Sequence, residues 1–444
     1  MLIRNQRLHD ALKAFLVEFL DLTGDRVKRG QLAIPEQLVA RVEFLGGGFK
    51  HDVEAVQDYV GLASKVLLDF GPDLRLDPLL ATLMTIPEVR AFLMIGSGGS
   101  EPAVMNLRIS LLARLIDRYY RECSLQARSD FRFDEGAFLT VYESLEEYLL
   151  GNEDTHRLIA PLVNFDMTEE RLALGLVTIR LLDADEVVRF NHVLPDSRSI
   201  TERPSFGLAR FGVETVVKSP RGSSEGISAG LDRLWWSVVC LKLAKKGAVT
   251  YGDVWMLPFH WSPYPGVTHQ SRVVQSSFFD VYRLTRDDMP YILRIWSKIE
   301  RYIEGPPPFW MVALGRFDDS TLRPRAEDKL IDTWIGCEAL LGKGVEVGEL
   351  RYQLSLRLAH LLETDAAARK KVRDSAMEAY KWRGKVVHGV PKLDHRKLSD
   401  LSLEMESLLR EALRKCLLNE IDTQEKLVTR IEASIIGETP LKEE

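Results

Sequence analysis

The period of the apolar residues changes twice along this 444-residue chain, and that change limits its fold class more than any other feature. Up to about residue 150, apolar side chains recur at helical spacing, as at Leu8, Leu12 and Phe19. From about 155 to 285 they alternate in short runs rich in β-branched residues, which is typical of strands. Helical spacing returns from about 286. The sequence therefore predicts an α+β fold that is predominantly α-helical.

These three stretches also predict the domains, since a domain takes about 150 residues. We expect a helical N-terminal region over 1–154, a mixed α/β region over 155–285 and a helical bundle over 286–444. The first region is expected to be helical throughout, with Val53, Val56 and Val60 on one helix. Strands are expected in the second region at 172–182, 206–217, 249–261 and 273–284, with a helix at 231–245. Helices are expected in the third at 286–304, 325–342, 348–363, 366–388, 399–420 and 422–436.

Several classes of protein are disfavoured by composition. The four cysteines are scattered without a C-x-x-C pair, which argues against a zinc cluster or a disulfide framework and suits a reducing cytoplasm. Charges run through the segment from Met1 to Leu20, unlike a signal peptide. The most apolar stretch, 234–241, falls well short of the roughly 20 residues that cross a bilayer. No P-loop, His-Glu-x-x-His or Gly-x-Ser-x-Gly motif is present. We expect a cytoplasmic protein without a membrane, metal or cofactor requirement.

Charge is unevenly distributed. The whole chain carries a net charge of −6, whereas residues 321–420 hold 19 Lys and Arg against 16 Asp and Glu, a net charge of +3. A basic region inside an acidic protein is a mild indication of a binding site for a polyanion.

Two charged residues interrupt apolar helical stripes in this basic region. Glu338 lies on the apolar stripe of the 325–342 helix, and Arg383 is centred on that of the 366–388 helix. The inward stripe of the second helix is expected to comprise Val372, Ala376, Ala379, Tyr380 and Val387. Burying a lone charge costs several kcal/mol, so the two are expected to face each other. A purely structural ion pair is the simplest interpretation.

His388 lies five positions after Arg383, which places it about 140° away around an ideal helix. The two side chains converge only if the helix unwinds at Gly389 or if a second copy of the chain supplies one of them. His388 also lies at a helix C-terminus, which suits a group that transfers protons near neutral pH.

Two segments together carry a family resemblance. The sequence DKLIDTWIGCEALL from Asp328 is followed, further along the chain, by YKWRGKVVHG from Tyr380. This pattern, an acidic helix ending in Glu-x-Leu-Leu and then Arg-x4-His-Gly, resembles the Apea-like branch of the HEPN superfamily over most of the C-terminal region. The resemblance implies a helical bundle that forms a homodimer and brings two Arg-x4-His motifs to one cleft. Related domains are metal-independent ribonucleases of toxin–antitoxin, CRISPR and abortive phage-defence systems.

The resemblance implies catalytic roles for three residues. His388 would move a proton, Arg383 would stabilise charge on the phosphate, and Glu338 would orient Arg383. No metal is needed, because the 2′-hydroxyl of RNA is the nucleophile. The substrate would be RNA, with tRNA as one candidate, and the region before position 286 would sense a trigger such as a phage product. The residues expected to bind RNA are Lys381, Lys385, Arg373, Lys370 and Tyr380.

Other interpretations remain open. Many active members have a polar residue directly after the arginine, where this chain has Gly384, and that favours an inactive HEPN module that binds a nucleotide or partner and dimerises. A structural scaffold carried by the N-terminal regions is a third candidate. The basic cluster around Arg383 is also interpretable as a solvated helix face.

Overall fold

The computed structural model has the α+β, predominantly helical fold that the sequence predicts. It describes residues 3–45, 48–69, 76–96, 101–123, 125–151, 153–183, 186–187, 190, 209–220, 223, 225–258, 269–270, 281–390 and 393–437. No described helix offers a run of apolar residues that could carry it through a bilayer.

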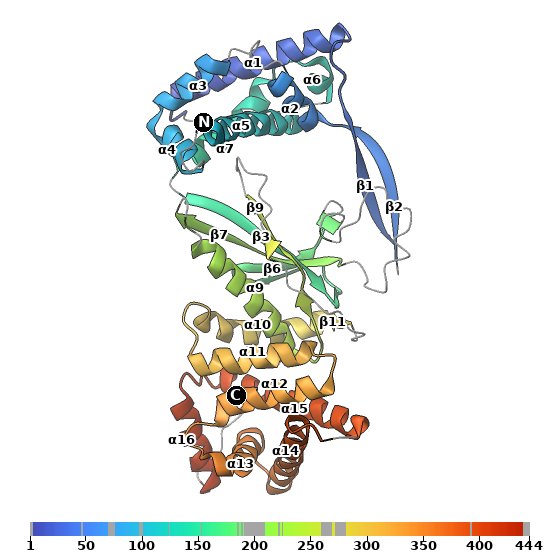
Figure 1. Ribbon diagram of the computed structural model, residues 1–444, viewed down its shortest axis with the longest axis vertical. Helices are drawn as coiled ribbons and strands as arrows, with labels where there is room; N and C mark the ends of the chain where they lie inside the picture. The colour runs from blue at the N-terminus through green and yellow to red at the C-terminus, as the bar shows by residue number, and fades with distance from the viewer. Residues whose placement is uncertain are drawn as a thin grey trace.

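The N-terminal region is a helical unit with its own hydrophobic core and a projecting β-hairpin (Figure 1). Buried side chains between Leu8 and Leu149 form the core without joining the core of the rest of the chain. The helices are α1 (Gln6–Lys28), α2 (Tyr59–Asp69), α3 (Leu76–Thr85), α4 (Pro87–Gly96), α5 (Glu101–Glu122), α6 (Leu125–Asp130) and α7 (Glu135–Leu150). The hairpin strands are β1 (Glu36–Leu45) and β2 (Gly48–Gln57), paired antiparallel from Glu36 opposite Gln57 to Leu45 opposite Gly48.

The expectation of an all-helical N-terminal region was wrong at this hairpin. Val53 and Val56 lie in β2, and only Val60 lies in a helix. Valines at this spacing fit a helical stripe, but the same residues favour an extended backbone, and pairing with β1 satisfies that preference.

The central region is an antiparallel sheet with one long helix on it (Figure 1). Its seven described strands run in the order β10-β9-β3-β7-β6-β5, with β8 also paired to β3, and β4 and β11 form a separate parallel pair. The strands are β3 (Glu153–Val163), β4 (Phe165–Met167), β5 (Arg171–Leu174), β6 (Val177–Leu181), β7 (Phe211–Pro220), β8 (Thr250–Tyr251), β9 (Val254–Pro258), β10 (His269–Gln270) and β11 (Tyr282–Leu284). The helix α9 (Glu225–Ala244) packs on β7.

The expected strands are present where the structure describes them, with three differences. The run 249–261 is divided into β8 and β9, and Gly252 and Asp253 lie in neither strand. The run 172–182 is a hairpin, β5 and β6, which turns at Gly175 with a φ of +55°. The central strand β3 was not predicted, and it contains Pro161, a residue that disfavours central strands. Pro161 is tolerated because it falls where β3 changes partner, from β9 at 156–159 to β8 at 162–163. Residues 206–208, 259–261 and 273–280 of the expected strands lie outside the described residues.

The C-terminal region is the expected helical bundle (Figure 1). Its helices are α10 (Met289–Ile299), α11 (Pro308–Leu322), α12 (Ala326–Leu341), α13 (Leu350–Leu362), α14 (Ala366–Val387), α15 (His395–Leu418) and α16 (Gln424–Ile435). α11 was not predicted, because the prolines before it suggested a break. Pro307 is instead its N-cap and Pro308 its first residue, where a missing N–H costs nothing.

The sheet and the bundle share one continuous hydrophobic core, from Leu158 in β3 to Ile431 in α16. A buried ion pair crosses the same boundary. Lys242 of α9 and Asp318 of α11 are 0% and 1% exposed, and the Lys242 ammonium donates to the Asp318 carboxylate. The predicted division at residue 285 therefore separates elements that pack together.

Candidate active site

Helix α14 carries most of the predicted site residues, and its ends are fixed by local chemistry. At its start, the Asp365 carboxylate accepts a hydrogen bond of 2.9 Å from the Ala368 N–H. At its end, Gly389 adopts a φ of +64°, and the Gly389 and Val390 N–H groups donate back to the Val386 and Lys385 carbonyls. This is a Schellman termination, which favours glycine at that position.

The buried face of α14 differs slightly from the prediction. Val372, Ala376 and Ala379 are buried as expected, but Val387 is 53% exposed and Trp382 is 6% exposed. The expectation that Val387 faces inward was therefore wrong. The large Trp382 ring is buried and lies near Lys397 of α15, so the inward stripe passes through Trp382 rather than through Val387.

Arg383 and Glu338 face each other between α14 and α12. An Arg383 Nη2 to Glu338 Oε1 distance of 3.7 Å makes this an ion pair that is longer than a hydrogen bond. The side chains are 26% and 30% exposed. The Arg383 Nε atom is buried and donates to no described residue. The guanidinium is thus held in place while its hydrogen-bonding capacity is left partly unused.

An aromatic pair supports this arginine. The guanidinium lies 5.6 Å from the centre of the Tyr380 ring, and Tyr380 packs edge-on against the fully buried Trp334 with centroids 5.0 Å apart. The Trp334 Nε1 atom is also buried without an acceptor among the described residues. Tyr380 therefore lies on the inward side of α14, as the sequence predicted, and acts as a packed platform for Arg383.

His388 lies on a different side of α14. The helix is regular up to Val387, and the His388 N–H still donates to the Gly384 carbonyl at 3.0 Å, so the unwinding that would turn His388 toward Arg383 is absent here. The two side chains leave the helix about 140° apart. His388 is exposed and shares its face with Lys370 and Lys381, which project at about 140–160° from Arg383.

The remaining residues predicted to bind RNA, Lys385 and Arg373, each lie against another side chain. Lys385 lies 4.3 Å from the Trp382 ring centre, and Lys397 of α15 lies 5.4 Å from it. Hydrogen bonds from Lys397 and Trp382 lower the pKa of the Glu378 carboxyl. Arg373 is paired with its neighbour Asp374 at 2.8 Å and is less available to a ligand.

Two contributors to the site were missed from the sequence. Trp334 and Lys397 surround the predicted residues but belong to other helices than α14. Trp334 did leave a signal in the sequence, because it lies one helical turn before Glu338 and so on the same face of α12. Lys397 carried no local signal.

No protein-family model, curated protein or solved structure matches this chain. Its chemistry is therefore argued from the side chains themselves. Arg383 can bind an anionic oxygen, since a half-buried guanidinium with an unused N–H favours a phosphate ligand. His388 can exchange protons with a ligand at the exposed end of α14.

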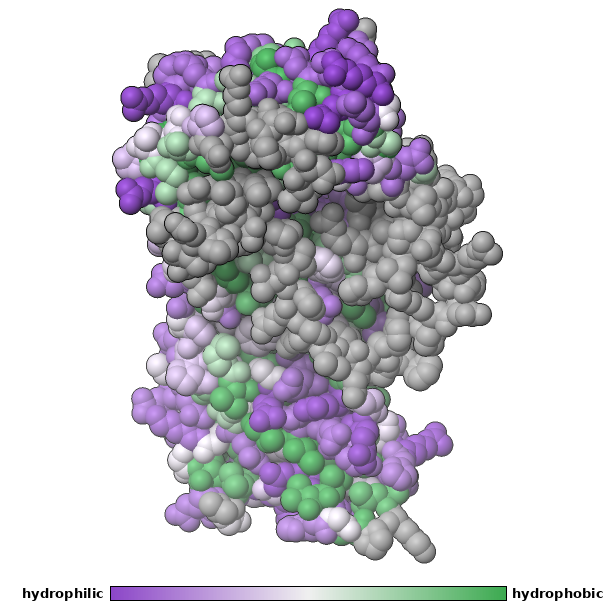
Figure 2. Space-filling model, turned by 45° about the horizontal axis from the view of Figure 1, so that its top comes forward, coloured by the Kyte–Doolittle hydropathy of each residue, from purple (hydrophilic) through white to green (hydrophobic). Residues whose placement is uncertain are grey.

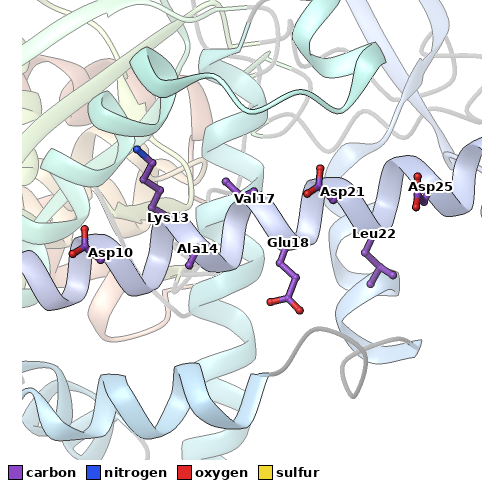
Figure 3. A pocket seen from close by; sticks show the side chains of 8 residues that line it. All are labelled: Asp10, Lys13, Ala14, Val17, Glu18, Asp21, Leu22 and Asp25. Atoms are coloured by element: carbon purple, nitrogen blue, oxygen red, sulfur yellow. The ribbon is translucent and has the colours of Figure 1, made fainter.

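A hollow of about 870 Å³ lies elsewhere, along α1 (Figure 3). Its described lining comprises Asp10, Lys13, Ala14, Val17, Glu18, Asp21, Leu22 and Asp25. Four carboxylates against one ammonium repel a polyanion, so this hollow is not a candidate for RNA binding.

The bundle itself exposes apolar surface among charged residues, visible at the lower end of Figure 2. Its exposed large apolar side chains are Leu293, Met311, Val312, Tyr352, Val387, Val390, Leu403 and Ile436. Val387 and Val390 flank His388 in the sequence, so exposed apolar side chains and an imidazole lie together at the end of α14.

Proposed function

We propose that this protein is a metal-independent endoribonuclease whose active site is assembled from two copies of the C-terminal bundle. The observation that supports the proposal best is Arg383, a supported guanidinium whose Nε has no acceptor among the described residues and whose carboxylate partner lies 3.7 Å away. A phosphate oxygen would fill the unused hydrogen-bonding capacity.

The chemistry follows from what RNA supplies. The 2′-oxygen attacks the adjacent phosphorus and loses its proton, the phosphorus–5′-oxygen bond breaks, and the leaving 5′-oxygen takes a proton. His388 exchanges these protons, and Arg383 stabilises the charge that develops on the non-bridging oxygens. The products are a 2′,3′-cyclic phosphate, or its hydrolysed form, and a 5′-hydroxyl. DNA lacks the nucleophile and stays intact.

A second copy explains how the two residues work together. Within one chain, Arg383 and His388 point about 140° apart, so a single scissile phosphate does not touch both. A two-fold dimer through the ends of α14 would place His388 of the partner subunit opposite Arg383. Val387 and Val390, 53% and 43% exposed, provide apolar surface for that contact.

The first experiment is cleavage of labelled tRNA and unstructured RNA in EDTA. Arg383→Ala is expected to lower the rate by about 10²–10³-fold, and His388→Ala by about 10²–10⁴-fold. Arg430→Ala and His395→Ala remove the same residue types from other exposed positions of the bundle and should leave the rate unchanged. Equal activity of wild type and the two α14 variants would refute the proposal.

A mixing experiment tests the shared site. If Arg383 and His388 act from different copies, mixed dimers of the two inactive variants contain one intact site, and the mixture regains about a quarter of wild-type activity. If both residues act from one chain, the mixture stays inactive.

A second candidate is a non-catalytic module that binds a nucleotide or partner. Gly384 directly after Arg383, together with the separation of Arg383 from His388 in one chain, favours it. This candidate predicts RNA or nucleotide binding that Arg383→Ala weakens, without any cleavage by wild type.

The biological setting follows from the resemblance alone. We place the enzyme in the cytoplasm as an effector of abortive phage defence, held inactive until residues 1–285 meet a trigger. Growth arrest on expression that His388→Ala relieves, but His395→Ala does not, would support this role.

A further inference from the structure

A second cavity, of about 530 Å³, lies where the central region meets the bundle. Four separate segments enclose it: the turn after α9, Val281 before β11, the α11–α12 turn and one face of α15. A volume of this size suits a small molecule. Neither Arg383 nor His388 lines the cavity.

The polar lining of the cavity carries an excess of positive charge. Lys246, Arg323 and Lys329 line it together with one carboxylate, that of Glu406. Lys246 forms no ion pair or hydrogen bond with any described residue. The Arg323 Nε donates to Asp332 at 2.7 Å, and its two terminal nitrogens make no hydrogen bond within the described part of the chain. Two cations from different segments thus keep free donors at the cavity.

The innermost cation belongs to a buried cluster that is itself positive. Lys329, Glu406 and Arg410 are 7%, 4% and 6% exposed, and both cations donate to the one carboxylate. Burial alone raises the pKa of the Glu406 carboxyl, but Lys329 and Arg410 outweigh it and the net shift is downward. The carboxyl is therefore ionised at neutral pH, and the cluster of three carries a charge of +1.

Lys329 shares the Glu406 carboxylate with Arg410, and an anion beside Lys329 would balance the remaining positive charge of this buried cluster. The remaining lining fits the rest of a small molecule. Hydroxyl groups come from Thr321, Ser399 and Ser402, and apolar contacts come from Ala248, Val281, Pro324, Ala326 and Leu403.

We infer that this cavity is a binding site for a small phosphorylated molecule, with the phosphoryl group held by Lys246, Arg323 and Lys329. The site is separate from the proposed ribonuclease centre and does not depend on it. Its ligand would fasten α12 and α15 of the bundle to the turn that follows α9.

Calorimetric titration of the full chain with inorganic phosphate, adenosine 5′-monophosphate and adenosine tests this site. The two phosphate-bearing probes should bind and adenosine should not. Lys246→Gln removes an exposed cation of the lining and should weaken binding about tenfold or more, the effect of one charge-assisted hydrogen bond. Lys28→Gln, at an exposed position of α1, is the matched control and should bind like wild type.

Ser399→Phe tests the location independently, because it fills the cavity without changing charge. It should abolish binding while the circular dichroism spectrum and the unfolding midpoint stay close to wild type. The inference is overturned if neither phosphate-bearing probe binds at millimolar concentration, if adenosine binds as tightly as its monophosphate, or if both cavity variants bind like wild type. This assay measures ligand binding and not RNA cleavage. A failure of the phosphate-site inference is therefore distinguishable from a failure of the ribonuclease proposal.

Discussion

Replacing Lys242 by methionine should be among the most damaging single substitutions in the chain. Its ammonium is fully buried and donates to Asp318, which is 1% exposed. Methionine keeps most of the volume but leaves the carboxylate with the Trp235 Nε1–H at 3.0 Å in place of an ionic partner. Removing one member of a buried ion pair costs about 3–5 kcal/mol.

This loss is large enough to measure by thermal or urea unfolding. At about 2–4 °C per kcal/mol for a unit of 150–250 residues, the midpoint should fall by about 6–20 °C. Because the sheet and the bundle share one core, the central and C-terminal regions should lose stability together, while the N-terminal unit, with its separate core, should be less affected.

A double variant decides whether the loss of the ionic partner is the cause. Adding Asp318→Asn to Lys242→Met removes the charge, keeps an acceptor for Trp235, and should restore more than half of the lost stability. A single variant that loses less than about 1 kcal/mol, or a double variant no better than the single one, would refute the reasoning.

Two further predictions follow from the same structure. Trp382→Ala should lower the free energy of unfolding in urea by about 3–5 kcal/mol, because the ring is 6% exposed. Val387→Ala, at a side chain that is 53% exposed, should change it by no more than about 0.5 kcal/mol. Similar losses in the two variants would mean that Val387 faces inward after all. Hydrogen bonds from Lys298 and Arg301 lower the pKa of Glu420 from its ordinary value of 4.5 to about 2. The ionised carboxylate therefore stabilises the fold at a pH above 4.5, and this contribution is lost as the pH falls toward 2. Carbon-detected NMR titration should show that pKa in wild type and a higher one in Lys298→Ala; an ordinary value in wild type would contradict the geometry.

The errors of the sequence-based prediction have specific physical causes. Val53 and Val56 satisfy helical spacing, yet they lie in a strand because their backbone pairs with that of β1. Pro308 suggested a break and instead begins α11. Pro161 disfavours a strand and is accommodated where β3 changes partners. In each case the local pattern allowed two structures, and contacts outside the segment selected one.

The candidate site, too, was predictable from the sequence only in part. The ion pair of Glu338 and Arg383 was predictable, because opposite charges on two apolar helix stripes are stabilised by pairing with each other. Their aromatic platform was not, since the contact between Trp334 and Tyr380 joins two helices. Lys242 directly follows the most apolar stretch of the chain, 234–241, and nothing in the sequence indicates that its side chain is fully buried.

The sequence by itself determined the helical and strand periods and the end of α14 at Gly389, because each depends on residues close together in the chain. It also determined the pairing of Glu338 with Arg383, because a charged side chain on an apolar stripe requires an opposite charge. The tertiary structure decided that Trp382 rather than Val387 is buried, that Lys242 has a partner in α11, and that four segments enclose a cavity rich in cations. These features arise where segments distant in sequence pack at close range, and burial there sets the free energy of each charge and ring.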